Sequence, residues 1–202
     1  MQSMLDLMPI TLRIVEQTDK PFPYFLAEQF VPPPLENELL RWLESEAPWR
    51  LVETDFYEQY EFSLFEADMP GSLAWLVSPE CLAHLRGLVE TTLGCRLTDK
   101  TDLVAHKLLA GQRIGIHNDY LEGHETHRLT VQLNQGLTDN DGGFFMLFNS
   151  FDANDVHKIL RPLSGSAVGF EISQDSHHAV SRMHGGERYT LVYSFYADRP
   201  AH

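Results

Sequence analysis

The stretch that decides the fold runs from His178 to Tyr196 and reads HAVSRMHGGERYTLVYSFY. Its two ends, His178–Met183 and Arg188–Tyr196, are rich in the β-branched and aromatic residues that favour strands. Between them lies His184-Gly185-Gly186, a glycine-containing turn signal. The stretch therefore predicts two consecutive strands joined by a turn.

The same pattern of short strands and turn signals begins after Asp99. Turn signals such as Asp141-Gly142-Gly143 separate the strands, and five further strands are predicted: Leu103–Leu109, Arg128–Leu133, Gly143–Phe148, Lys158–Leu163 and Ser166–Ile172. Many short strands at regular intervals predict a double-sheet jelly roll or a barrel.

The first half of the chain has a different periodicity. A short strand is predicted within Pro21–Phe30, and amphipathic helices are predicted over Leu35–Ala47 and Leu73–Leu93, the second ending near Gly94. We therefore expect an α+β, mainly β protein. Residues 1–98 would supply a strand and supporting helices, and residues 99–199 a jelly-roll (double-stranded β-helix) core, in one compact unit.

Charge and cysteine content narrow the class of protein. The 202 residues carry a formal net charge of −14, which argues against binding to nucleic acid or to a membrane through a general basic surface. Cys81 and Cys95 have no metal-type spacing, so buried thiols in a reducing compartment are expected. The N-terminus has no long apolar run, so we expect a cytoplasmic protein without signal peptide or membrane anchor.

His117 and Asp119 form the first candidate metal site. Two residues apart in an extended segment, their side chains would project to the same side. Two histidines and one carboxylate leave open positions on a metal, as in non-haem iron(II) oxygenases. The third ligand must come from elsewhere. His177 and His178 would face opposite ways on a strand, and six histidines are expected to be surface or hydrogen-bonded core residues: His106, His124, His127, His157, His184 and His202.

These elements resemble the 2-oxoglutarate and iron(II)-dependent dioxygenase superfamily, in particular its prolyl-4-hydroxylase-like branch. The resemblance covers about Asp102 to Tyr196 in register. It rests on these elements in order: Gly111 before His117-x-Asp119, Arg128-x-Thr130, Leu133-Asn134, Gly142-Gly143, Pro162-x-x-Gly165, His178-x-Val180 and Gly186-x-Arg188. Several ordered elements together are more specific than any single motif.

The resemblance implies a function and the residues that carry it. Fe(II) would be held by His117, Asp119 and His178, with 2-oxoglutarate as cosubstrate and O2 as oxidant. Arg188 offers a planar fork for the distal carboxylate of the cosubstrate, and Thr190 lies two residues along on the same strand face. The implied reaction is hydroxylation of an unactivated carbon with release of succinate and CO2. Asp119 favours hydroxylation, because halogenases of the superfamily have a small residue there.

One position departs from the family, and the substrate stays open. The family often has a tyrosine three residues before the glycine that corresponds to Gly111, and here that residue is Leu108. Tyr120, Thr130 and Asn134 are candidates for the missing polar contact. A peptide or protein side chain is the expected substrate. The alternatives are a free amino acid or small metabolite, and a non-catalytic metal-binding jelly-roll module.

Two segments that flank the metal motif are expected to cover the mouth of the site. They are the aromatic and acidic stretch Trp49–Phe65 and the loop Tyr120–His127.

Overall fold

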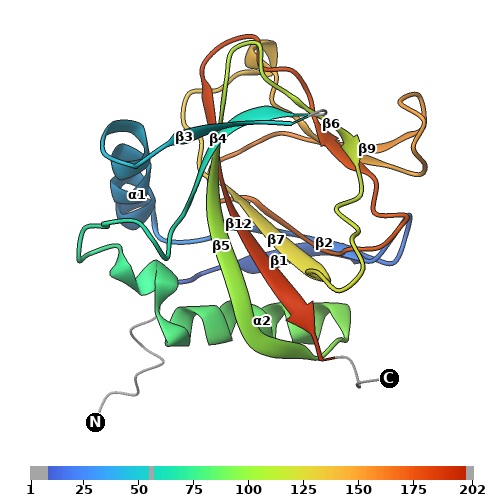
Figure 1. The fold of residues 1–202 in the computed structure, drawn as a ribbon, viewed down its shortest axis with the longest axis horizontal. Coiled ribbons are helices and arrows are strands. Elements are labelled where there is room, and N and C mark those ends of the chain that lie inside the picture. The colour runs from blue at the N-terminus through green and yellow to red at the C-terminus, as the bar shows by residue number, and fades with distance from the viewer. Residues whose placement is uncertain (1–8, 55–56, 199–202) are drawn as a thin grey trace.

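Two antiparallel sheets face each other in the computed structural model, which describes residues 9–54 and 57–198 (Figure 1). The larger sheet has the spatial order β1 (Arg13–Thr18), β2 (Tyr24–Glu28), β10 (Ala167–Glu171), β7 (His127–Gln132), β12 (Glu187–Ala197), β5 (Leu97–Leu109), β4 (Glu58–Ser63) and β3 (Arg50–Glu53). The smaller sheet has the order β6 (Ile114–His117), β11 (His178–Val180), β8 (Phe145–Phe148) and β9 (Val156–Leu160). The predicted mainly β jelly-roll fold is confirmed.

Two helices, α1 (Pro33–Ser45) and α2 (Pro79–Leu93), support the larger sheet from outside (Figure 1). The prediction of one helix over Leu73–Leu93 is wrong, because the chain forms the short 3-10 helix η2 (Ala74–Val77) and then breaks at Ser78. Ser78 is extended, as residues before a proline tend to be, and its side chain caps α2. The predicted end of α2 at Gly94 is confirmed by its left-handed conformation.

The alternation of side chains along β12 separates the core from the site. Tyr189, Leu191, Tyr193 and Phe195 pack into a hydrophobic cluster with the helices. The residues between them face the other way, into the space between the sheets. Arg188 and Thr190 therefore reach the interior of the jelly roll.

The sequence did not predict four of the strands, namely β1, β3, β4 and β6. Strands β3 and β4 form a hairpin from the aromatic and acidic stretch, and β4 pairs with β5 at the edge of the larger sheet. The predicted division of the chain at residue 98 stays a prediction. Strands from both sides of that residue share the larger sheet.

Some other predictions concern the periphery of the molecule. Cys81 is buried as expected, whereas Cys95 is only partly buried, and both are free thiols. None of the helices among the described residues is long and apolar enough to span a membrane. The prediction for His202 falls outside the described residues.

Candidate active site

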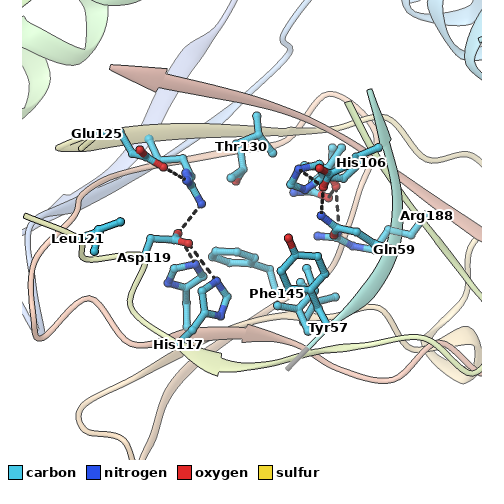
Figure 2. Close-up of a pocket in the computed structure, with 18 residues that line it drawn as sticks. Tyr57, Gln59, His106, His117, Asp119, Leu121, Glu125, Thr130, Phe145 and Arg188 are labelled. Carbon is cyan, nitrogen blue, oxygen red and sulfur yellow. Dashed lines mark hydrogen bonds and ion pairs between the residues drawn. The ribbon is translucent and has the colours of Figure 1, made fainter. Parts of the chain in front are cut away.

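A cavity of about 490 Å³ lies between the two sheets (Figure 2). The smaller sheet contributes His117 and His178 to its lining, and β12 contributes Arg188 and Thr190. Both segments that were expected to cover the mouth take part in the lining, Trp49–Phe65 through three residues and Tyr120–His127 through two. The cavity therefore brings together all five site residues that the sequence predicted.

Strand pairing and one unusual backbone conformation assemble the group His117, Asp119 and His178. The two histidines lie directly opposite each other on β6 and β11, and their ring centroids are 4.2 Å apart. Asp119 is not extended, as the sequence argument assumed. It adopts the left-handed conformation (φ 58°), which aspartate tolerates better than most residues. The potential ligand atoms of the three side chains lie within 4.8 Å of one another and can hold one metal ion.

Hydrogen bonds fix which nitrogen of each histidine faces this point. Nδ1 of His117 lies 2.8 Å from the carbonyl oxygen of Gly115, and Nδ1 of His178 lies 2.8 Å from that of Ser176. Because a carbonyl oxygen only accepts, each Nδ1 must carry the proton. Both Nε2 atoms are then left with a lone pair near Asp119, at 3.3 Å and 3.1 Å from its carboxylate oxygens. His177, the rival ligand, is not in this group and packs against Phe151.

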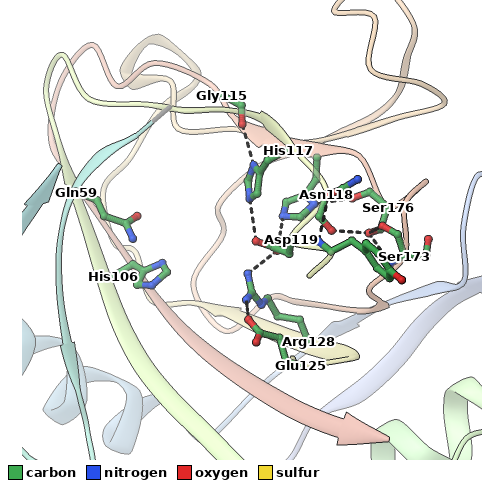
Figure 3. Close-up of polar contacts among 12 residues, drawn as sticks. Gln59, His106, Gly115, His117, Asn118, Asp119, Glu125, Arg128, Ser173 and Ser176 are labelled. Atoms are coloured by element: carbon green, nitrogen blue, oxygen red, sulfur yellow. Dashed lines mark hydrogen bonds and ion pairs between the residues drawn. The ribbon is translucent and has the colours of Figure 1, made fainter. Parts of the chain in front are cut away.

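Arg128 on β7 neutralises the carboxylate of Asp119 (Figure 3). The same guanidinium donates to Glu125 at 2.7 Å. Burial would raise the pKa of Asp119, but the positive charge of Arg128 outweighs this effect and holds the pKa well below its usual range. Burial also lowers the pKa of His178. An ionised carboxylate and neutral imidazoles are the forms that bind iron(II).

Arg188 is the second unusual feature of the cavity. Its side chain is buried, with only 3% of the residue exposed, and burial lowers its pKa to about 10, so it keeps its charge at neutral pH. It donates to the carbonyl oxygen of Gly143 at 2.9 Å and to the hydroxyl of Thr190 at 2.8 Å. Gly143 must remain a glycine, because a Cβ there would lie 2.5 Å from Met183 and 3.0 Å from Arg188. Among the described residues, no carboxylate pairs with this buried cation.

Comparison with known proteins decides the family. Residues 103–196 match the 2OG-Fe(II) oxygenase superfamily, and they include the His-Asp-His group and Arg188. This segment, just under half of the chain, is a domain of that superfamily. It is a 2-oxoglutarate-dependent dioxygenase, and its cofactors are Fe(II), 2-oxoglutarate and O2. The sequence-based expectation of an enzyme is confirmed.

Solved structures show that this oxygenase has the fold of prolyl hydroxylases. A prolyl-4-hydroxylase of Pseudomonas putida is 16% identical with a TM-score of 0.69, covering 87% of this chain and 93% of its own. A prolyl hydroxylase of Trichoplax adhaerens is 14% identical with a TM-score of 0.71, covering 87% and 84%. A viral collagen prolyl hydroxylase of Paramecium Bursaria Chlorella virus-1 is 15% identical with a TM-score of 0.61, covering 85% and 94%. A search of curated proteins by sequence found no match.

Leu108 of the oxygenase is buried in the apolar cluster between the sheets, so it offers no polar contact to the cavity. Of the three proposed substitutes, only Thr130 lines the cavity. Tyr120 is exposed, and Asn134 is occupied by the carbonyl oxygen of Pro162 and the backbone of β12.

The structure adds Gln132, which the sequence argument overlooked. It lies directly across from Thr190 on β7, and its Oε1 accepts from the Thr190 hydroxyl at 3.1 Å. Its Nε2 is buried and has no hydrogen-bond partner. A chain of hydrogen bonds thus runs from Arg188 through Thr190 to Gln132 and ends in unused N–H groups beside the cavity. The pattern of a polar residue inside a β-rich run was the available signal.

The wall of the cavity that β4 and β5 form was not predicted from the sequence. Gln59, Glu61 and His106 line the cavity there. Gln59 and His106 lie across from His117 and Asp119 (Figure 3). His106 was expected to be an ordinary surface or core histidine, but it faces Glu61 at 3.9 Å. Gln59 and Glu61 were not recognised as cavity residues, because β4, the strand on which they alternate, was not predicted.

Proposed function

We propose that the oxygenase hydroxylates an unactivated carbon of a peptide or protein side chain and releases succinate and CO2. Arg188 carries this proposal. A buried cation without a carboxylate partner is costly for a protein, and it lies in the same cavity as a group of residues suited to iron. A small dianion that chelates the metal and reaches Arg188 would satisfy both.

In this proposal, His117, Asp119 and His178 hold Fe(II). Their donor set is the two-histidine, one-carboxylate arrangement of non-haem iron oxygenases, and both Nε2 atoms are already turned toward Asp119. Arg128 balances the charge of Asp119 until the metal binds. The loop that carries Asp119 is fastened by Asn118, which donates to the carbonyl oxygen of Gln174 at 2.9 Å.

The distal carboxylate of 2-oxoglutarate binds Arg188 and Thr190 in this proposal, with Gln132 as the second donor in place of the missing tyrosine. Arg188 is held in place by Gly143 and Thr190, so little side-chain entropy is lost on binding. The free N–H groups of Gln132 supply hydrogen bonds that the apolar Leu108 cannot.

The bound iron and cosubstrate would supply the oxidising chemistry, reducing O2 as 2-oxoglutarate loses CO2. The residues of the chain bind, orient and exclude water. The aromatic ring of Phe145 packs against His178 with centroids 5.5 Å apart and keeps water from this side of the metal ligands. Val180 and Val192 add further apolar lining.

A peptide or protein substrate is supported by the fold. The similar prolyl hydroxylase of Trichoplax adhaerens was solved with a peptide fragment of hypoxia inducible factor. Here Gln59 and Glu61 of β4 line the cavity, as do Leu121 and Glu125 after Asp119. Release of succinate with randomised peptides, compared with the twenty free amino acids, distinguishes a peptide substrate from a free one.

Anaerobic titration with Fe(II) and 2-oxoglutarate tests the cofactor assignment. We expect a weak visible charge-transfer band in the wild type and none in His178→Ala. His177→Ala is the matched control, because this neighbouring histidine lies outside the metal group. A band that survives in His178→Ala would refute the ligand assignment.

A further inference from the structure

The cavity has two linings of opposite character. Its floor on β12 and β7 presents the cation of Arg188 and the free N–H groups of Gln132. Its wall on β4 presents the carboxylate of Glu61 and the amide of Gln59. The floor suits an anion, whereas the wall suits a group that donates hydrogen bonds.

Among the described residues, three carboxylates line the cavity, and one of these three has no lysine or arginine paired with it. Asp119 and Glu125 are both bound by Arg128. Glu61 pairs with no lysine or arginine in the described part of the chain; its neighbours are the amide of Gln59 at 2.8 Å and the imidazole of His106 at 3.9 Å. Burial lowers the pKa of His106 to about 3, so this histidine is neutral and does not balance the charge.

Gln59 provides a second, independent observation. It is 3% exposed, and its NH₂ group must face Glu61, because a carboxylate can only accept. Its carbonyl oxygen Oε1 is consequently left buried without a hydrogen-bond partner. A buried acceptor of this kind costs stability until a donor reaches it.

We infer that Glu61 and Gln59 form a substrate-binding wall that recognises an aliphatic cation, the side chain of a lysine or arginine in a peptide. The carboxylate would pair with the positive charge, and Oε1 of Gln59 would accept a further N–H. This inference rests on the proposed function, in which the floor of the same cavity is taken by 2-oxoglutarate. The net charge of −14 would favour the approach of the same class of substrate.

Binding can be tested without turnover when Mn(II) replaces Fe(II) in the presence of 2-oxoglutarate. The probes are the capped pentapeptide acetyl-Gly-Gly-Lys-Gly-Gly-amide, its norleucine analogue, and the n-butylammonium ion alone. Paramagnetic broadening of the side-chain methylene signals reports binding beside the metal. We expect the lysine peptide to bind about tenfold more tightly than the norleucine peptide, as expected for a hydrogen-bonded charge.

Matched variants test whether Glu61 and Gln59 are the residues that recognise the lysine side chain. Glu61→Gln should remove the preference for lysine, whereas Glu53→Gln should keep it, because Glu53 is an exposed acid on the same hairpin that does not line the cavity. Gln59→Met should weaken lysine binding without changing the net charge, and it serves as the test if Glu61→Gln does not fold.

The outcomes separate this inference from the proposed function. Failure of 2-oxoglutarate to bind would refute the proposed function. If 2-oxoglutarate binds but lysine and norleucine peptides broaden equally, or neither broadens, only the cation-binding wall is refuted. Equal preference in Glu61→Gln and the wild type would overturn it as well. Binding of n-butylammonium but not of the lysine peptide would overturn the peptide assignment in favour of a free amine.

Discussion

Replacing Arg188 by methionine separates the cost of this residue to the folded protein from its role in binding the cosubstrate. Burial lowers the pKa of Arg188 from 12.5 to about 10, which corresponds to about 3 kcal/mol against the charged form. Methionine removes that cost. It also leaves the Gly143 carbonyl and the Thr190 hydroxyl without their donor, at about 1–2 kcal/mol each. The opposing effects nearly cancel, so the free energy of unfolding should change by less than about 1 kcal/mol.

The affinity for 2-oxoglutarate should respond very differently. Loss of a buried, charge-assisted contact to a carboxylate costs about 2–4 kcal/mol, which is roughly a 30- to 1,000-fold rise in the dissociation constant. Calorimetric titration of the iron-loaded protein under anaerobic conditions measures the affinity, and urea unfolding of the ligand-free protein measures the stability.

Arg161→Met is the matched control, since this arginine is exposed and pairs with Asp139 on the surface. It should leave 2-oxoglutarate binding unchanged. An affinity of Arg188→Met within about threefold of the wild type would show that the cosubstrate carboxylate is held elsewhere. A large fall in the free energy of unfolding of Arg188→Met would instead show that the guanidinium stabilises the folded protein.

Three further predictions concern Asp119, two glycines with positive φ, and His106. Asp119→Ala should abolish hydroxylation and iron binding, because the metal group loses its carboxylate. Normal succinate release would refute the assignment of Asp119 as an iron ligand. Gly142→Ala should cost about 2–4 kcal/mol in urea unfolding, since its φ is 75° and a Cβ would lie 2.1 Å from a backbone oxygen. Gly94→Ala, with a similar φ of 68° but open space, should cost only about 1 kcal/mol. The low pKa of His106 means that unfolding takes up a proton below about pH 6.5, so stability should fall from pH 6.5 toward pH 4. His106→Gln should show a smaller fall over that range, and parallel curves would contradict the burial argument.

The sequence predicted the strands of the second half well because their composition and their turns agree. β12 is one example: its apolar residues alternate with the residues that face the cavity, and a glycine turn precedes it. The first half was harder. In β4 the polar residues Gln59 and Glu61 face the cavity, so the apolar alternation that marks a strand is absent.

The group His117, Asp119 and His178 was predictable from the resemblance to the family and not from strand alternation. An extended segment would place His117 and Asp119 on one side, whereas the chain turns at Asp119 and the register of β6 and β11 brings in His178. The resemblance to the family selected three residues that the structure brings close together, and their role as iron ligands stays a prediction. Strand alternation alone would have left His177 and His178 equivalent.

Polar atoms that folding leaves without partners are beyond any sequence pattern, and here they point to ligands. Nothing in the string VQLN shows that Oε1 of Gln132 is taken by Thr190 while its Nε2 is left free. The same is true of Gln59, whose orientation is fixed only once Glu61 lies beside it. One amide leaves donors at the cationic floor and the other leaves an acceptor at the acidic wall. Because a water-filled cavity would have no reason to sort donors from acceptors in this way, the sorting favours two bound partners of opposite charge over one.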